Sequence, residues 1–240
     1  MARNLAEVAA DVSRGDCSET PDARQRVVRP WDARQEGNST LPVFGLIGGI
    51  AAGKTAVAHC FESLGAVVLD ADRAAHEVLR SPEVEEAARN RWGLAIFDED
   101  GRIDRRRLAQ IVFSATPSGP KELAYLEQLT HPRIGEVLSR QGEEAVAGGK
   151  ALALVVDAPV MLEAGWGGFC DKIVFVDASR EVRLKRVLQR GWSEKEFAAR
   201  ESTQESLDVK RSLADVTIDN SGSLEETQAQ VERFCQSHIK

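Results

Sequence analysis

The chain has 240 residues, of which 42% are hydrophobic and 29% charged, a composition typical of soluble globular proteins. Its formal net charge of −7 argues against general binding to nucleic acid or anionic membranes, so anionic ligands would have to meet local positive clusters. No apolar run approaches the roughly 18 residues that a membrane span needs, and no secretory signal is present. The 4 cysteines and 4 histidines lack the spacing of metal ligands, so we expect reduced thiols and a cytoplasmic protein.

Residues 1–41 differ from the rest of the chain. They mix charges with glycine and proline and show little periodicity beyond a short possible helix. We therefore expect a flexible N-terminal extension, or residues read from an upstream start codon. One α/β domain, which the remaining length can accommodate, follows them.

An octet that fits the phosphate-loop pattern G-x-x-x-x-G-K-[ST] opens this domain. Its members are Gly48, Gly49, Ile50, Ala51, Ala52, Gly53, Lys54 and Thr55. An apolar run precedes the octet, and Val57, Phe61 and Leu64 follow at helical spacing, so we expect strand, loop and helix in succession. An accidental glycine-rich turn is the alternative, and the flanking pattern argues against it.

The residue types of the octet suit a nucleoside triphosphate. Glycines let backbone N–H groups approach phosphate oxygens, and the helix beginning near Gly53 points its positive dipole end at the same anion. Lys54 would place a positive charge on the transferred phosphates, and the Thr55 hydroxyl would hold Mg²⁺. We assign nucleotide binding to the octet and to Ala56, which follows it.

Five strand-like runs alternate with helical segments, which predicts a parallel sheet with right-handed crossovers. The runs cover residues 43–47, 66–69, 151–156, 172–177 and 216–218. Functional groups in such sheets lie at the carboxyl ends of the strands. The glycine loop and several polar positions fall there: Asp70, Asp72, residues 157–163, Asp177, Asp219 and Asn220. This coincidence predicts one shared site.

Two further segments interrupt the alternation. Residues 73–149 are mostly helical, with an expected break or restart at His131-Pro132. Residues 182–211 carry eight Lys or Arg against five Asp or Glu, so their charge is opposite to that of the whole chain. Arg183, Arg186 and Arg190 would share one helical face and could clamp phosphoryl oxygens as a lid, although charge runs are often solvated helix faces.

Asp70 and Asp72 lie two residues apart at a strand end. In an extended strand they share a face, unless the chain turns between them. One of them can accept the proton of an acceptor hydroxyl as general base, and we favour Asp72 for that role. The structural alternative is a helix N-cap, for which aspartate is a preferred residue.

Several classes of phosphate-loop protein compete at this point. A GTPase needs an N-K-x-D motif, which occurs nowhere in the chain. A small-molecule kinase needs an acceptor-side base and a cationic lid, and both have candidates here. A non-catalytic nucleotide-binding regulator would have no need of the acceptor-side base.

The motifs taken together resemble the dephospho-CoA kinase family over about residues 43–235. The matching positions are 45–55, 64–65, 68–72, 98–102, 106, 108, 131–132, 159, 162–163, 184–186, 204, 210–211 and 218–223. The resemblance implies ATP-dependent phosphorylation of the ribose 3′-hydroxyl of dephospho-CoA, the last step of coenzyme A synthesis, with Mg²⁺ as the cofactor. It implies an α/β P-loop kinase fold with a five-stranded parallel sheet flanked by helices, plus a helical CoA-binding insert and a lid.

The resemblance also assigns regions and roles. The nucleotide-binding core would comprise about residues 43–72, 150–181 and 212–237, the acceptor domain about 73–149, and the lid about 182–211. Asp72 would be the base, Arg186 the phosphate-clamping lid arginine, and Asn220 would lie near the adenine end. Asp70 and His131 would lie on the acceptor side, although a helix-start role for His131 before proline stays open. ATP and dephospho-CoA are the expected partners of a monomer or weak homo-oligomer.

One departure from the family concerns the loop itself. Relatives usually have Gly-Ser where this chain has Ala51-Ala52. Alanine serves at this position if φ is negative, but it resists a positive φ. The departure removes no charged group, so it bears on rate and affinity more than on reaction type. Another kinase of the same fold, acting on a different small metabolite, is the competing hypothesis.

Overall fold

The computed structural model describes residues 41–114, 116–158, 161–162, 165–202 and 204–239. The predicted flexible extension therefore lies outside the described residues, apart from Leu41, as do Pro159 and Glu163 of the third strand's end.

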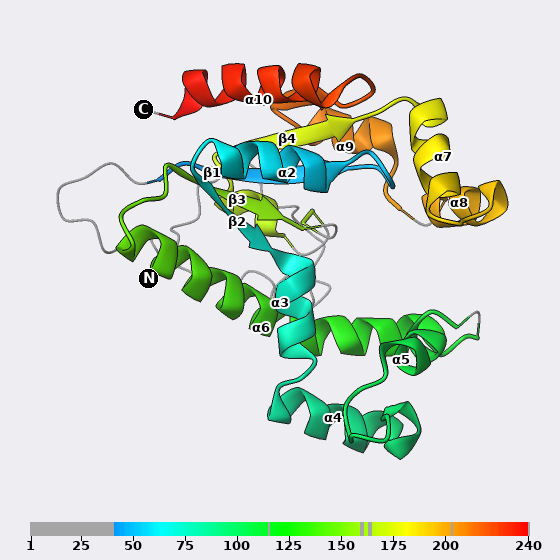
Figure 1. The fold of residues 1–240 in the computed structure, drawn as a ribbon. Coiled ribbons are helices and arrows are strands. Elements are labelled where there is room, and N and C mark those ends of the chain that lie inside the picture. The colour runs from blue at the N-terminus through cyan, green and yellow to red at the C-terminus, as the bar shows by residue number, and fades with distance from the viewer. Residues whose placement is uncertain (1–40, 115, 159–160, 163–164, 203, 240) are drawn as a thin grey trace.

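A five-stranded, all-parallel sheet forms the centre of the fold, as predicted, in the order β2-β3-β1-β4-β5 (Figure 1). The strands are β1 (Val43–Gly48), β2 (Ala66–Asp70), β3 (Ala153–Asp157), β4 (Lys172–Asp177) and β5 (Val216–Asp219). The inner strands are continuous apolar runs because both of their faces are covered, as in other parallel sheets. β1 is the central strand, so the loop that follows it leaves from the middle of the sheet's carboxyl edge.

Helices cover both faces of the sheet (Figure 1). On one face, α2 (Lys54–Ser63) and α10 (Leu224–His238) pack against the strands, and their core includes Phe44, Phe61 and Phe234. On the other face, α3 (Ala71–Val78) and α6 (Gly119–Ala147) form a second core around Leu69, Leu138 and Trp166. The sheet thus lies between two packed layers of helices.

A smaller cluster stands apart from these two cores. It is made of α4 (Pro82–Trp92), the 3₁₀ turn η2 (Leu94–Ile96), α5 (Arg105–Val112) and the start of α6. Its buried residues are Ala88, Ile96, Phe97, Leu108 and Val112. α6 packs against α5 of this cluster and against β2 of the main sheet, so it connects the two (Figure 1).

The predicted break at His131-Pro132 is wrong, because α6 is a single helix of 29 residues that continues through Pro132. Proline removes one backbone donor from the helix. Two side chains supply donors nearby: Thr130 Oγ1 donates to the carbonyl of Leu126 at 2.8 Å, and Arg133 donates to that of Leu129 at 2.6 Å. Beyond the proline, Ile134 and Leu138 are buried against the sheet, so tertiary packing outweighs the local helix-breaking preference.

The segment predicted to form a lid folds into three short helices. They are α7 (Arg180–Gln189), α8 (Glu194–Glu201) and α9 (Leu207–Leu213). Each begins with a serine whose side chain caps the helix: Ser179, Ser193 and Ser206. A further 3₁₀ turn, η3 (Trp166–Phe169), lies between β3 and β4. None of the helices in the described ranges is long and apolar enough to cross a membrane.

Gly45 in the middle of β1 gives a test of this packing. A Cβ atom there would lie 2.5 Å from Met161 Sδ, 2.8 Å from Cys170 Sγ and 3.0 Å from Ile173 Cδ1. Met161 is fully buried, so its side chain has little room to retreat. We expect Gly45→Ala to lower the free energy of unfolding by about 1–3 kcal/mol, measured by urea denaturation.

Gly167→Ala is the matched control. Its Cβ would lie 3.8 Å from the same Ile173 atom, which is an ordinary contact distance. We expect a change of at most about 0.5 kcal/mol for this variant. Equal stabilities for the two variants would contradict the packing described for β1.

Candidate active site at the carboxyl edge of the sheet

The glycine-rich loop lies between β1 and α2, as the octet predicts. Gly53 has a left-handed φ of 95° and precedes Lys54, the first residue of α2. A side chain on Gly53 would also collide with the amide of Asn220, so both the backbone angle and the space require glycine here. The first N–H groups of a helix have no intrahelical partner, and the dipole end is positive, so the start of α2 can receive an anion.

Ala51 has the conformation that alanine resists. Its φ is 58°, the one positive value among the described residues other than glycine. A left-handed L-residue costs roughly 1–2 kcal/mol, so this loop conformation must be held by its surroundings. Within the loop, the Ala52 N–H donates to the Gly49 carbonyl at 3.1 Å.

Arg186 of α7 supplies a contact from outside the loop. Its guanidinium donates to the carbonyls of Ala51 at 3.2 Å, Ala52 at 2.9 Å and Asn220 at 2.8 Å. Burial lowers the pKa of Arg186, and the charge of nearby Arg190 lowers it further. In this arrangement Arg186 fixes the shape of the loop, and its expected role as a phosphate clamp stays a prediction.

Asn220 holds the loop from the end of β5. It is 4% exposed, and its Nδ2 donates to the Ala52 carbonyl at 2.7 Å. Its Oδ1 accepts from the hydroxyl of fully buried Thr227, at 3.0 Å, which orients the amide. Sequence reasoning placed Asn220 near the nucleotide and missed Thr227, because a buried threonine in a helix carries no motif.

Lys54 meets a carboxylate that had no assigned role. Lys54 Nζ lies 2.5 Å from Asp157 Oδ1, and the two side chains are only 18% and 16% exposed. Asp157 ends β3, in register with Leu46 of β1 on one side and Asp70 of β2 on the other. The sequence places Asp157 among several aspartates at the carboxyl ends of strands. Only the three-dimensional structure shows that this one pairs with Lys54.

Asp70 and Asp72 are separated by a change of structure. β2 ends at Asp70 and α3 begins at Ala71, so the two carboxylates do not share a strand face. Asp70 is the N-cap of α3, and its side chain accepts from the Arg73 N–H at 2.9 Å. Asp72 lies exposed in the first turn of α3 and has no ion pair recorded within the described chain. The base role of Asp72 and the acceptor role of Asp70 stay predictions.

His131 lies on α6, facing the loop after β3. Its ring centroid is 6.0 Å from that of Trp166, at an angle of 60°. Burial lowers the pKa of His131, which favours the neutral imidazole. Trp166 is 1% exposed, and its indole Nε1 has no hydrogen-bond partner among the residues that the structure describes. The structure therefore brings His131 to a buried aromatic neighbour.

No cluster of three or more His, Cys, Asp or Glu side chains is placed to hold a metal among the residues that the structure describes. Oxygen donors near Lys54 in the described part of the chain include the Thr55 hydroxyl, which is exposed, and the Asp157 carboxylate. Such hard donors suit Mg²⁺, which usually binds one or two protein oxygens together with substrate phosphates. The residues present therefore fit a metal that arrives with the nucleotide.

The helices of the predicted lid contact the loop from the side of α7. Arg183 is 4% exposed, donates to the Ala178 carbonyl at 3.1 Å and pairs with Glu201 of α8 at 2.5 Å. Its guanidinium also lies close to Gly49 of the loop. Arg183 is thus buried beneath α8, whereas Arg190 is the exposed C-cap residue of α7, so the three predicted lid arginines have different surroundings.

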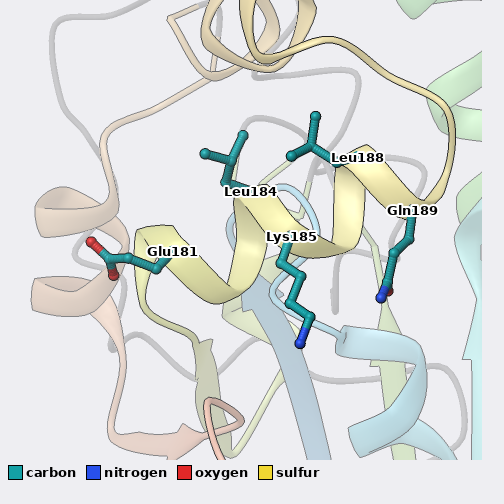
Figure 2. Close-up of a pocket in the computed structure, with 5 residues that line it drawn as sticks. All are labelled: Glu181, Leu184, Lys185, Leu188 and Gln189. Atoms are coloured by element: carbon teal, nitrogen blue, oxygen red, sulfur yellow. The ribbon is translucent and has the colours of Figure 1, made fainter.

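A shallow hollow of about 520 Å³ borders the outer side of α7 (Figure 2). Its described lining is Glu181, Leu184, Lys185, Leu188 and Gln189. Leu184 and Leu188 point to one side of the helix, and Lys185 and Gln189 point to the other. Since none of these residues belongs to the loop or to the strand ends, we do not assign the hollow to phosphate binding.

Comparisons with known proteins identify the family of the chain. The family model for dephospho-CoA kinase matches residues 42–226. The dephospho-CoA kinase of Syntrophotalea carbinolica is 40% identical over 192 residues, covering 79% of this chain and 88% of the relative. That of Bacillus licheniformis is 37% identical over 195 residues, covering 80% of this chain and 94% of the relative.

Solved structures agree as well. A protein from Thermus thermophilus superposes with a TM-score of 0.71 at 30% identity, covering 84% of this chain and 100% of its own. The dephospho-CoA kinase from Campylobacter jejuni gives a TM-score of 0.55 at 26% identity, covering 82% of this chain and 97% of its own. Since the family model spans the loop, the strand ends and helices α7 to α9, this chain belongs to the dephospho-CoA kinase family.

Proposed function

We propose that this protein transfers the γ-phosphoryl group of ATP to the ribose 3′-hydroxyl of dephospho-CoA, giving coenzyme A and ADP. This is the final step of coenzyme A synthesis. The observation that carries the proposal is the family match over residues 42–226, which includes an intact phosphate loop with Lys54 at the start of α2. The carboxylates near the neighbouring strand ends can supply the base that a kinase needs to accept the proton of the acceptor hydroxyl.

In the transfer, the 3′-oxygen of the acceptor bonds to the γ-phosphorus while the bond from that phosphorus to the ADP oxygen breaks. The hydroxyl proton passes to the Asp72 carboxylate as general base. Asp72 suits this role because it is exposed in the first turn of α3, just beyond the edge where the loop lies. Asp70 positions this turn by capping α3, which is how it would contribute to the acceptor side.

On the donor side, residues 48–56 would bind the nucleotide phosphates, with Lys54 directed at the transferred group. Arg186 and Asn220 would hold the loop in its binding shape, and Arg186 could reach phosphoryl oxygens if the lid moves. Thr55 and Asp157 would hold Mg²⁺ together with the nucleotide. The bound Mg²⁺ supplies neutralisation of phosphate charge during the transfer.

The helical segment and the lid segment have separate proposed roles. The helical segment of about residues 73–149, whose tip has its own core, would form the acceptor domain, and residues 182–211 would form the lid. His131, half-buried against Trp166, would line the acceptor side as a neutral imidazole. We expect a cytoplasmic enzyme that is a monomer or a weak homo-oligomer.

Incubation of the purified protein with Mg·ATP and dephospho-CoA, followed by chromatographic detection of coenzyme A and ADP, tests the proposal. We expect the two products in equal amounts. A kinase for another small metabolite is the competing function. It would be supported by turnover of a different acceptor, such as a nucleoside, without coenzyme A above background, and that outcome would rule out the proposed reaction.

The role of Asp72 makes a separate prediction. Asp72→Asn removes the proton acceptor but keeps the size of the side chain, so we expect kcat to fall by roughly 10²–10⁴-fold. Because Asp72 lies on the acceptor side, the dissociation constant for Mg·ATP should change little. Steady-state kinetics and calorimetric titration with Mg·ATP measure the two quantities.

Glu77→Gln is the matched control for Asp72. Glu77 lies on the same helix, is exposed and pairs with Arg140 at 2.8 Å. We expect kcat within about twofold of wild type, since surface ion pairs contribute little. Near-wild-type turnover by Asp72→Asn would show that another group accepts the proton.

The buried His131 makes the stability of the protein depend on pH. Its pKa is lowered from 6.5 by burial, so the unfolded state binds a proton more readily than the folded state. This difference costs nothing well above pH 6.5, and it destabilises the fold progressively as pH falls below that value. Urea denaturation between pH 7 and pH 5 should therefore show a smaller loss of stability in His131→Gln than in wild type.

His76→Gln, which changes an exposed histidine of α3, is the control and should keep the wild-type pH dependence. If His131→Gln lost stability with falling pH as steeply as wild type, the buried imidazole would not be a source of that dependence.

A further inference from the structure

The ion pair between Lys54 and Asp157 joins two fixed points of the fold. Lys54 begins α2, immediately after the phosphate loop, and Asp157 ends β3, which pairs with β1. The two atoms are 2.5 Å apart, and neither side chain is more than 18% exposed. An ion pair in this setting is screened less than a surface pair, so it matters for anything that binds beside it.

Asp157 is distinct among the strand-end aspartates that the structure describes. Asp70 caps α3 through the Arg73 N–H, and Asp177 at the end of β4 pairs with Arg211 at 2.9 Å. Only Asp157 has the lysine of the phosphate loop as its recorded partner. Its carboxylate therefore engages the lysine that is expected to meet an anionic phosphate.

This placement has opposite consequences for two forms of the same nucleotide. A metal-free triphosphate must compete with Asp157 for Lys54, and it meets the repulsion of a carboxylate that is only 16% exposed. A triphosphate that carries a divalent cation brings a positive charge to the same carboxylate. The Thr55 hydroxyl, one residue after Lys54, is a second hard oxygen donor of the kind that Mg²⁺ prefers.

We propose that Asp157 makes nucleotide binding depend on the divalent cation, by holding Lys54 in the empty enzyme and penalising metal-free ATP. In the empty protein the carboxylate keeps Lys54 beside the loop. With Mg·ATP, Lys54 passes to the phosphates, and the carboxylate becomes available to the cation. Asp157 is thus a specificity-determining residue for the metal-bound form of the donor. The inference rests on the proposed function only in assuming that Lys54 contacts the phosphates.

Binding measurements on Asp157→Asn test the inference without reliance on turnover. Calorimetric titration with ATP is done twice, in EDTA and in excess Mg²⁺. Because the amide neither repels phosphate nor holds Lys54 as an ion pair, we expect metal-free ATP to bind at least about fivefold more tightly than to wild type. We expect Mg·ATP to bind equally or more weakly, so the ratio of the two dissociation constants moves toward one.

A purely structural role for Asp157 gives a different result. If the substitution only disturbed the loop, both forms of ATP would bind more weakly by a similar factor, and that outcome would overturn the inference. An unchanged ratio would overturn it as well. Asp157→Ala, which removes the carboxylate by a different side chain, provides the same comparison should the asparagine variant fail to fold by circular dichroism.

Asp215→Asn is the matched control. Asp215 pairs with Lys172 at 3.1 Å, which is another Lys–Asp pair on a strand of the sheet, but it lies at the opposite, amino edge. Both dissociation constants should stay at wild-type values. If wild type forms coenzyme A but Asp157→Asn keeps the wild-type ratio, the inference fails alone. If wild type binds ATP but yields no coenzyme A, the proposed function fails. The inference about Asp157 is then still tested by the ratio of the dissociation constants for metal-free ATP and Mg·ATP.

Discussion

The hydrogen bonds that Arg186 and Asn220 make to the loop carbonyls are the constraint on which the site depends. Three bonds of 2.7–3.2 Å reach the carbonyls of Ala51 and Ala52 from α7 and from the end of β5. They act on a loop in which Ala51 has a φ of 58°, a strained angle that a free loop would leave. The loop's shape is therefore imposed by tertiary structure, because its own sequence lacks the glycine that would adopt this angle without cost.

The parallel sheet makes these contacts possible. Every strand runs in the same direction, so the loop after β1, Asp157 at the end of β3 and Asn220 after β5 all lie at one edge. Lys54 and Asp157 are 103 residues apart in the chain, yet the pairing of β1 with β3 brings them within 2.5 Å. A site of this kind tolerates long insertions between strands, and the separate core around Phe97 and Leu108 is such an insertion.

Much of this architecture is predictable from the sequence, for identifiable reasons. The strands were predictable because runs buried on both faces are continuously apolar, and the phosphate loop because its motif lies between a strand and a helix. The continuity of α6 through Pro132 was not, since it depends on burial of Ile134 and Leu138 against the sheet. The partners of Arg186 and Asp157 were not predictable either. Periodicity places a charged side chain on one face of a helix or strand, but it does not identify a contacting residue that lies 100 or more positions away in the chain.

A double-mutant cycle on ATP binding tests the central claim, that tertiary bonds hold a strained loop in its binding shape. The cycle compares Arg186→Gln in the natural Ala51 background with the same change in an Ala51→Gly background, by calorimetric titration with Mg·ATP. Any direct contact of Arg186 with phosphate is lost in both backgrounds and cancels. We expect the loss of Arg186 to weaken binding more with Ala51 than with glycine, because glycine keeps the left-handed angle unaided. The expected coupling free energy is about 0.5 kcal/mol or more. Equal losses in the two backgrounds would contradict it.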